Sequence, residues 1–185
     1  MRADATARLE AWLPPDEGQA RLRLEYLAFL AEHDDAMWRE CRVGHLTASA
    51  LVMDEHRERV LLTLHPKVGR WLQLGGHCEP DDPSLREAAR REAIEESGIA
   101  HVLISAAPIR LDRHPVPCAG AMSEHLDVQY LATVGADARE VMSDESDDLR
   151  WFPVSGLPAD VDESVRALID AAITPREPGS LILVG

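Results

Sequence analysis

Three glutamates share one side of a predicted helix in the middle of this 185-residue sequence. Glu92, Glu95 and Glu96 are three and four positions apart, so at about 100° per residue their side chains lie close together. Burying an unpaired charge costs several kcal/mol or more, so carboxylates that lean toward the protein require a cation. Oxygen ligands at this spacing suit Mg²⁺ or Mn²⁺. An ordinary solvent-exposed acidic helix remains the alternative.

The limits of this helix are marked by its capping residues. Ser84 and Glu87 form a capping box, which predicts a start at Ser84, and Gly98 predicts the end. The glutamates continue an apolar stripe instead of lying opposite it, and this stripe comprises Leu85, Ala88 and Ala89.

Arg91 lies one step around the helix from this stripe. It is four residues from both Glu87 and Glu95, so we expect it to pair with both carboxylates and to hold the acidic cluster in shape.

The string from Arg91 to Ile99, with Gly76 upstream, resembles the signature of the Nudix hydrolases. That signature is a glycine, five residues, a glutamate, seven residues and then REUxEExGU, where U is a bulky aliphatic residue. The second half fits, except that Ala93 is small. The first half is one residue longer than in the family and lacks its glutamate, so Asp82 or, less well, Glu79 must serve there.

The resemblance implies an α/β fold, a Nudix-type α/β/α sandwich with a mixed sheet. It also implies a hydrolase that cleaves a nucleoside diphosphate linked to another group, by attack of water on phosphorus. A diphosphate is anionic, so carboxylates act on it only through bridging divalent cations. We expect Glu92, Glu95, Glu96 and the Gly76 carbonyl to hold Mg²⁺ or Mn²⁺.

The proton of the attacking water requires a carboxylate within hydrogen-bond reach. Glu95 or Glu96 is the first candidate and Glu145 the second, since related enzymes often supply a glutamate from a loop at that position. Asp144 is a weaker candidate, and Arg91 supports the catalytic group.

Polar residues in three other segments are candidates for substrate contacts. His77 follows the double glycine, and the loop 65–70 carries cationic side chains. A strand at 124–134 alternates, so that its polar residues face either a substrate cavity or solvent. The predicted substrate contacts are His77, Lys67, Arg70, His125, Asp127 and Gln129.

Two other functions remain open. The irregular first half of the signature favours a Nudix-fold module that binds a nucleotide or sugar ligand without cleaving it. Cys78 beside the signature is compatible with chemistry like that of isopentenyl-diphosphate isomerase, which some relatives perform with a cysteine and a glutamate.

The chain divides into three predicted parts. Residues 1–43 form a helical extension with helices before Pro14, at about 17–32 and at about 36–41. This extension either packs on the domain or forms the contact of a homodimer. Residues 44–175 form the main α/β domain, in which a hairpin at 46–64 precedes the signature and a helix at 161–173 closes the second face. Residues 176–185 form an apolar tail suited to an edge strand or to packing against a partner chain.

The composition of the sequence limits the cellular compartment and the binding partners that we expect for this protein. With 19 basic and 33 acidic residues the formal net charge is −14, which disfavours long nucleic acid and leaves small phosphorylated substrates. The sequence has no apolar run of eighteen residues and no signal-peptide core at its start, so we expect no membrane partner and a cytoplasmic location. The three separated cysteines are expected to be reduced thiols.

Overall fold

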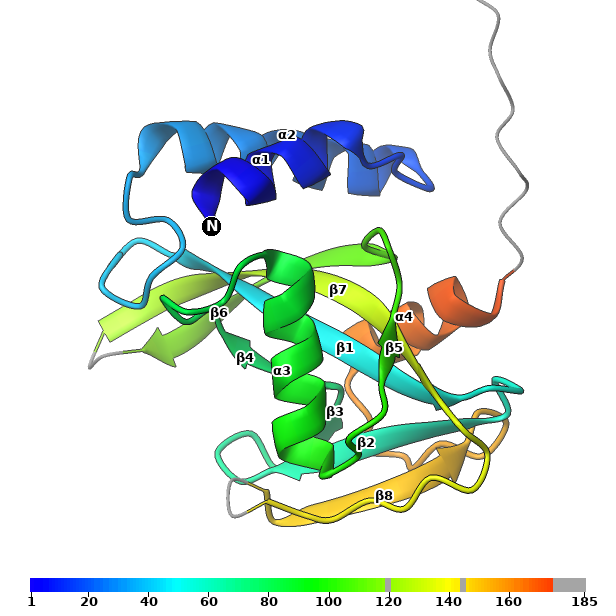
Figure 1. Ribbon diagram of the computed structural model, residues 1–185. Helices are drawn as coiled ribbons and strands as arrows, with labels where there is room; N and C mark the ends of the chain where they lie inside the picture. Colours follow the sequence, from blue (N-terminus) through cyan, green and yellow to red (C-terminus); the bar gives the residue numbers. More distant parts are fainter. Residues whose placement is uncertain (119–120, 144–145, 175–185) are drawn as a thin grey trace, which may run out of the picture.

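Within the described residues, the fold is an eight-stranded mixed sheet between helices (Figure 1). The computed structural model describes residues 1–118, 121–143 and 146–174. Helix α3 (Leu85–Ser97) crosses one face of the sheet, and α4 (Glu163–Ile173) packs on the opposite face. This arrangement confirms the predicted α/β/α sandwich with a mixed sheet.

Two long parallel strands form the centre of the sheet. β1 (His45–Asp54) pairs with β7 (Ala121–Val134) over ten residues, from His45 opposite His125 to Asp54 opposite Val134. Because the other strands pair with different halves of this central pair, the sheet branches. β4 (Leu74–His77) pairs with the first half of β1 and β2 (Arg59–His65) with its second half.

The remaining strands extend the sheet from β2 and β7. All of these pairings are antiparallel. On β2 they are β3 (Arg70–Leu72) and β8 (Asp148–Pro153), and on β7 they are β5 (Leu103–Ile104) and β6 (Arg110–Cys118).

The two-residue period of β1 divides its side chains between the two faces. Leu46, Ala48, Ala50 and Val52 pack in the apolar core that contains α3. Leu51 and Met53 pack in the second core with α4. The other odd positions of β1 are polar and buried, and they are His45, Thr47 and Ser49. This face is therefore apolar at one end of the strand and polar at the other.

The N-terminal helices pack onto the domain. α1 (Arg2–Ala11) and α2 (Glu17–Glu32) lie together above the end of the sheet (Figure 1). In α2, the Gln19 side chain bonds to both the backbone N–H and the carbonyl of Leu111, at 2.7 and 3.0 Å, and the Tyr26 hydroxyl donates to the Asp112 carbonyl at 2.6 Å. Helix α2 thus satisfies backbone groups of β6. The boundaries predicted at residues 43 and 175, and a homodimer, stay predictions.

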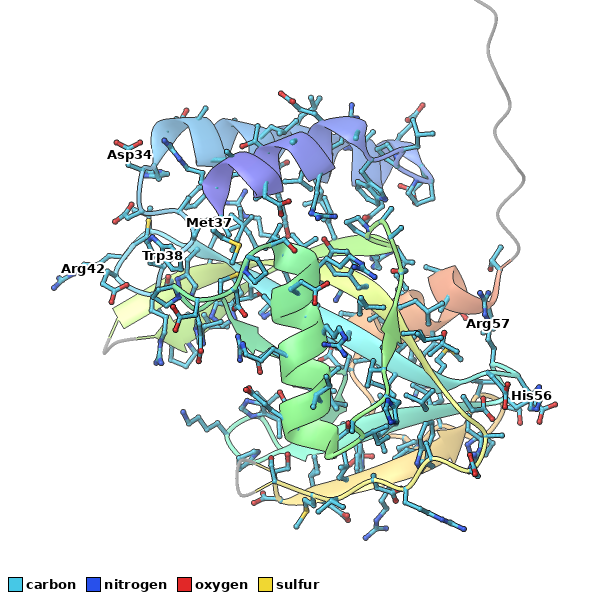
Figure 2. The ribbon with its side chains drawn as sticks, viewed as in Figure 1. Asp34, Met37, Trp38, Arg42, His56 and Arg57 are labelled. Carbon is cyan, nitrogen blue, oxygen red and sulfur yellow. The ribbon has the colours of Figure 1, made fainter. Side chains whose placement is uncertain are left out.

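The predicted helix at 36–41 is wrong, because this segment forms successive turns. Its backbone bonds join Ala36 to His33, Trp38 to Asp35 and Cys41 to Trp38, each across three residues. The Ala36 carbonyl instead accepts from Leu46 at the start of β1. The turns place Met37 and Trp38 below α2, against the core (Figure 2).

The nine-residue strand β6 contains Pro115 and Pro117, and it pairs only with β7 among the described strands. On helix α2, Leu24 is 60% exposed. The tail that was predicted to add a strand lies outside the described residues.

Arg57 closes the turn between β1 and β2. It has a left-handed backbone with φ of 56°, and its side chain donates to the Ala172 carbonyl at the end of α4 at 2.8 Å (Figure 2). Among the described helices, none combines the length and the apolar character needed to span a membrane.

Two leucines of α2 test how tightly the N-terminal helices are packed. Leu30 is 2% exposed and Leu24 is 60% exposed. We expect Leu30→Ala to lower the free energy of unfolding by about 2–4 kcal/mol, because it leaves a cavity. Leu24→Ala should change it by less than about 0.5 kcal/mol. Urea denaturation measures both, and equal effects would mean that α2 does not contribute to the core.

Candidate functional site

Both ends of α3 are capped as the sequence predicts. The Ser84 hydroxyl accepts from the Glu87 backbone N–H at 3.2 Å, and Gly98 ends the helix with φ of 68°. The Gly98 backbone N–H donates to the Ile94 carbonyl at 2.8 Å. These caps fix the rotation of the helix and therefore the direction of its glutamates.

Arg91 is the hub of the site. Its guanidinium donates to both carboxylate oxygens of Asp82 at 3.0 Å and to the His77 carbonyl at 3.0 Å. It also donates to Glu92 and Glu95, each at 2.9 Å. One side chain thereby joins α3, the preceding turn and the end of β4. The hydrogen bonds with Asp82, followed by its other carboxylate neighbours, raise the pKa of Arg91 above its ordinary value.

The predicted pairing of Arg91 with Glu87 is wrong. Glu87 pairs instead with the adjacent Arg86, with a nitrogen–oxygen distance of 3.0 Å. Arg86 also donates to the Ser105 and Ile104 carbonyls, so this pair belongs to the contact between α3 and β5. The pairing of Arg91 with Glu95 is confirmed.

The double glycine brings the backbone of β4 against two of the glutamates. A Cβ at Gly76 would lie 2.8–2.9 Å from the carboxylate atoms of Glu92. The Gly75 backbone N–H donates to Glu96 at 3.0 Å, and a Cβ at Gly75 would collide with Ser49 at 2.3 Å. Only glycine at both positions lets β4 fit between β1 and the carboxylates.

The three carboxylates differ in their surroundings. The Glu92 side chain is 12% exposed and that of Glu95 is 58% exposed. Glu92 and Glu96 face the double glycine, whereas Glu95, which accepts from the same Arg91 nitrogen as Glu92, is mostly exposed to solvent. The helical stripe predicted that all three carboxylates point inward to the same extent, and this prediction does not hold for Glu95. Glu92, Glu96 and the adjacent backbone still offer the oxygen donors that a hard divalent cation prefers, in a space that a Cβ would fill.

The irregular part of the signature forms a tight turn before α3. The Asp82 carboxylate accepts from the Glu79 backbone N–H at 2.8 Å, and the Asp82 N–H donates to the Glu79 carbonyl at 3.0 Å. Glu79 lies 3.9 Å from Arg91, compared with 3.0 Å for Asp82, and is far more exposed. Asp82 is thus the acid that supports Arg91 most closely.

A second group of polar residues lines the opposite face of β1 and β7. We call it the polar face, and it comprises His45, Thr47, Ser49, His77, His125, Asp127 and Gln129. Asp127 is 3% exposed and accepts from the Thr47 and Ser49 hydroxyls at 3.0 and 2.6 Å. Burial raises its pKa, and these hydrogen bonds act in the opposite direction.

The amides of Gln73 and Gln129 complete the surroundings of Asp127. Their nitrogens donate to its carboxylate at 3.3 and 3.2 Å. Their oxygens are buried without a hydrogen-bonding partner among the described residues. Asp127 and Gln129 are thus buried and do not face bulk solvent. Their contact with a substrate stays a prediction.

Three histidines gather at one end of the polar face. The rings of His45, His77 and His125 are 4.8–5.1 Å apart, centroid to centroid. Burial lowers the pKa of His77 to about 4 and that of His125 to about 3, with nearby cationic and histidine side chains as weaker causes. These two imidazoles are therefore neutral at pH 7.

The cationic loop residues lie elsewhere. Arg70 pairs with Asp162, the N-cap residue of α4, at 3.1 Å, and Lys67 is an exposed residue of the turn between β2 and β3. Glu145 and Asp144, predicted as a base or ligand, lie outside the described residues.

Several polar-face residues were missed in the sequence. His45, Thr47 and Ser49 alternate on β1 in the same way as His125, Asp127 and Gln129 on β7. The period-two pattern could have identified them. Gln73 lies between β3 and β4 and had no such signal.

Comparisons with known proteins cover most of the chain. The sequence model of the NUDIX domain matches residues 44–172. Among curated proteins, none has a sequence that matches this chain. Solved structures do resemble it, among them a hydrolase of the NUDIX family from Clostridium perfringens, with 25% identity, a TM-score of 0.57 and coverage of 69% of this chain and 95% of that one.

Two more distant structures share the fold. The dihydroneopterin triphosphate pyrophosphohydrolase of E. coli is 15% identical with a TM-score of 0.56, covering 70% of this chain and 95% of that one. The NUDIX domain of Shewanella oneidensis NrtR, complexed with ADP ribose, is 22% identical with a TM-score of 0.54, covering 78% and 94%.

Replacing Arg91 by lysine tests the hub. Lysine keeps the charge but cannot reach Asp82, His77 and the glutamates together, because it lacks the planar fork. We expect Arg91→Lys to lower the free energy of unfolding by about 1–3 kcal/mol, as charged hydrogen bonds are lost. Arg90→Lys, on the same helix, should have little effect. Urea denaturation at pH 7 measures both, and an unchanged Arg91→Lys variant would contradict the role assigned to this side chain.

The pH dependence of stability tests the burial of the histidine group. Between pH 3 and 6.5 the unfolded chain protonates His125 more readily than the folded chain, because the folded pKa is about 3 and the ordinary value is about 6.5. Stability therefore falls as the pH drops below about 6.5, by at most about 1.4 kcal/mol per unit for this residue.

The variant His125→Gln removes this group, so its stability should fall less steeply between pH 6.5 and 5. Urea denaturation at several pH values in the presence of a chelator measures the slope. An equal slope in both proteins would show that His125 titrates normally in the fold.

Proposed function

Since this chain belongs to the Nudix family, we propose that it is a metal-dependent hydrolase that cleaves a diphosphate linkage in a nucleoside-diphosphate-type or related small phosphorylated substrate, by attack of water on phosphorus. The observation that carries this proposal is the arrangement of Glu92 and Glu96 against the double glycine, held by Arg91. The structural similarity to known hydrolases supports it.

The residues assigned to the cation are Glu92, Glu95, Glu96 and the Gly76 carbonyl. When bound there, Mg²⁺ or Mn²⁺ supplies charge neutralisation on the phosphates and lowers the pKa of a coordinated water. Glu92 and Glu96 are the inner ligands in this assignment, since they face the backbone of β4. Glu95 is more exposed than Glu92, and it lies at the solvent side of the group.

The protein must also remove a proton from the attacking water. Glu96 and Glu95 are the candidates for this general base among the described residues, and Glu145 is the candidate outside them. Arg91 does not accept the proton, because its pKa is raised. Its role is to fix the directions of Glu92 and Glu95 before substrate binds, which reduces the cost of ordering them later.

The polar face provides the surface for the remainder of the substrate. Asp127 and Gln129 offer buried hydrogen-bonding groups, and His77 connects them to the carboxylates, because its carbonyl accepts from Arg91. A small polar ligand with both donors and acceptors fits such a lining. Lys67 and Arg70 are assigned to the outer, anionic part of the substrate. To contact it, Arg70 has to break its ion pair with Asp162.

The isomerase alternative is disfavoured by the state of Cys78. This cysteine is 6% exposed, and burial raises its pKa to about 12. A thiol that stays protonated is poorly suited to act as an acid–base or nucleophilic group. A module that binds its ligand without cleaving it remains the competing function, and turnover distinguishes it from a hydrolase.

The proposed hydrolysis predicts a large effect of single glutamate substitutions. Purified protein with Mg²⁺ or Mn²⁺ is assayed against dinucleotides, nucleotide sugars and nucleoside triphosphates. With the best substrate, Glu92→Gln and Glu96→Gln should each lower turnover by about 100-fold or more, the scale of losing a metal ligand or base.

Glu87→Gln is the matched control, because it removes the same charge from the same helix in the pair with Arg86. It should retain nearly full activity. Calorimetric titration with Mn²⁺ should show binding that Glu95→Gln/Glu96→Gln loses. Ligand binding without turnover across the panel would instead support the binding module.

A further inference from the structure

We propose that His45, His77 and His125 form a second metal site, which binds a transition-metal ion such as Zn²⁺ through three imidazole nitrogens. The candidate ligand atoms of these residues all lie within 4.8 Å of one another. The site is separate from the carboxylates of α3 and does not depend on hydrolytic activity.

The register of three strands brings these histidines together. His45 begins β1 and lies directly opposite His125 of β7. His77 ends β4 opposite Thr47, which has the same orientation as His45 because it lies two residues along the strand. The three side chains therefore project from neighbouring strands to the same face of the sheet.

The separation of the rings suits a shared ion. With a Zn–N distance of about 2.0–2.1 Å and tetrahedral angles, the centroids of two coordinating imidazoles lie about 5.2 Å apart. The observed centroid distances are 5.0 Å for His45 and His77, 4.8 Å for His45 and His125, and 5.1 Å for His77 and His125. Small rotations of the side chains would direct three nitrogens to one point.

Buried nitrogens without partners are the second observation. Both ring nitrogens of His45, and Nε2 of His77 and of His125, have no hydrogen bond within the described part of the chain. The Cys41 carbonyl approaches the His45 ring, but not in hydrogen-bonding geometry. A buried polar atom without a hydrogen-bonding partner is unfavourable, because it has lost its contact with water and gained nothing in return. Coordination would satisfy one nitrogen of each ring.

The donor set selects the type of ion. Neutral imidazoles suit Zn²⁺, Ni²⁺ and Cu²⁺, whereas Mg²⁺ and Mn²⁺ prefer oxygen. His45 is fully buried, but His77 and His125 are only partly buried. An ion held by these three rings thus has an open fourth position on the side of the partly exposed histidines, which water or a substrate atom can take.

Cobalt(II) tests this site because its visible absorption reports nitrogen ligands in a site of low coordination number. The chelator-treated, full-length protein is titrated with Co²⁺ in excess Mg²⁺, which occupies the carboxylates. We expect one equivalent to give an intense band that Zn²⁺ removes by competition. Zn²⁺ should also raise the melting temperature of the apoprotein.

Substitution of single histidines locates the ion. His77→Gln and His125→Gln should each weaken Co²⁺ binding by about 100-fold or more, which corresponds to two or more factors of ten in the dissociation constant. His101→Gln, a change at an exposed residue beyond α3, should bind as the wild type does. Glu95→Gln/Glu96→Gln should keep the band, because the imidazoles are intact.

Three results would overturn the proposal. They are a wild-type protein without the band, a band that persists in both histidine variants, and a band that disappears only in the glutamate variant. Circular dichroism confirms that each variant is folded. Two different histidine variants are used so that failure of one to fold leaves the other as the test.

Discussion

The site depends on one guanidinium group that holds three parts of the chain together. Arg91 bonds to Asp82 in the turn, to the His77 carbonyl at the end of β4 and to Glu92 and Glu95 on its own helix. Arginine suits this role because its five N–H donors lie in one rigid plane. Without it, adjacent carboxylates on α3 would repel one another and β4 would lose its link to the turn.

The turn between β4 and α3 explains why an irregular signature keeps its geometry. An additional residue inside a helix would rotate every later side chain by about 100°. Here the extra length lies between His77 and Ser84, where the Glu79–Asp82 turn takes it up and Ser84 starts the helix anew. Asp82 reaches Arg91 at 3.0 Å from this turn, as expected for the acid that would stand in for the glutamate of the signature.

Much of this architecture could be predicted from sequence because its signals are local. Ser84 and Gly98 marked the ends of α3, and α2 has the predicted span of residues 17–32. Tertiary contacts explain the errors. Arg91 pairs with Asp82 and not with Glu87, because the turn before α3 brings Asp82 against the guanidinium. The spacing of residues along a helix carries no information about the conformation of that turn. The three histidines come together only because β1 pairs with both β4 and β7. The sequence of a single strand does not indicate which strands are its neighbours in the sheet.

The alternation of β4 keeps the two sets of donors apart. Gly76 faces Glu92 and α3, whereas Gly75 and His77 face the side of Ser49 and Thr47. Adjacent residues of one strand thus border an oxygen-rich site on one side and an imidazole group on the other. Hard cations prefer the first set and transition metals the second, so the two proposed sites would bind different types of ion although only one peptide unit lies between them. A shift of β4 by one residue would exchange these faces, and the pairing of β4 with β1 and the close approach of Gly75 to Ser49 oppose such a shift.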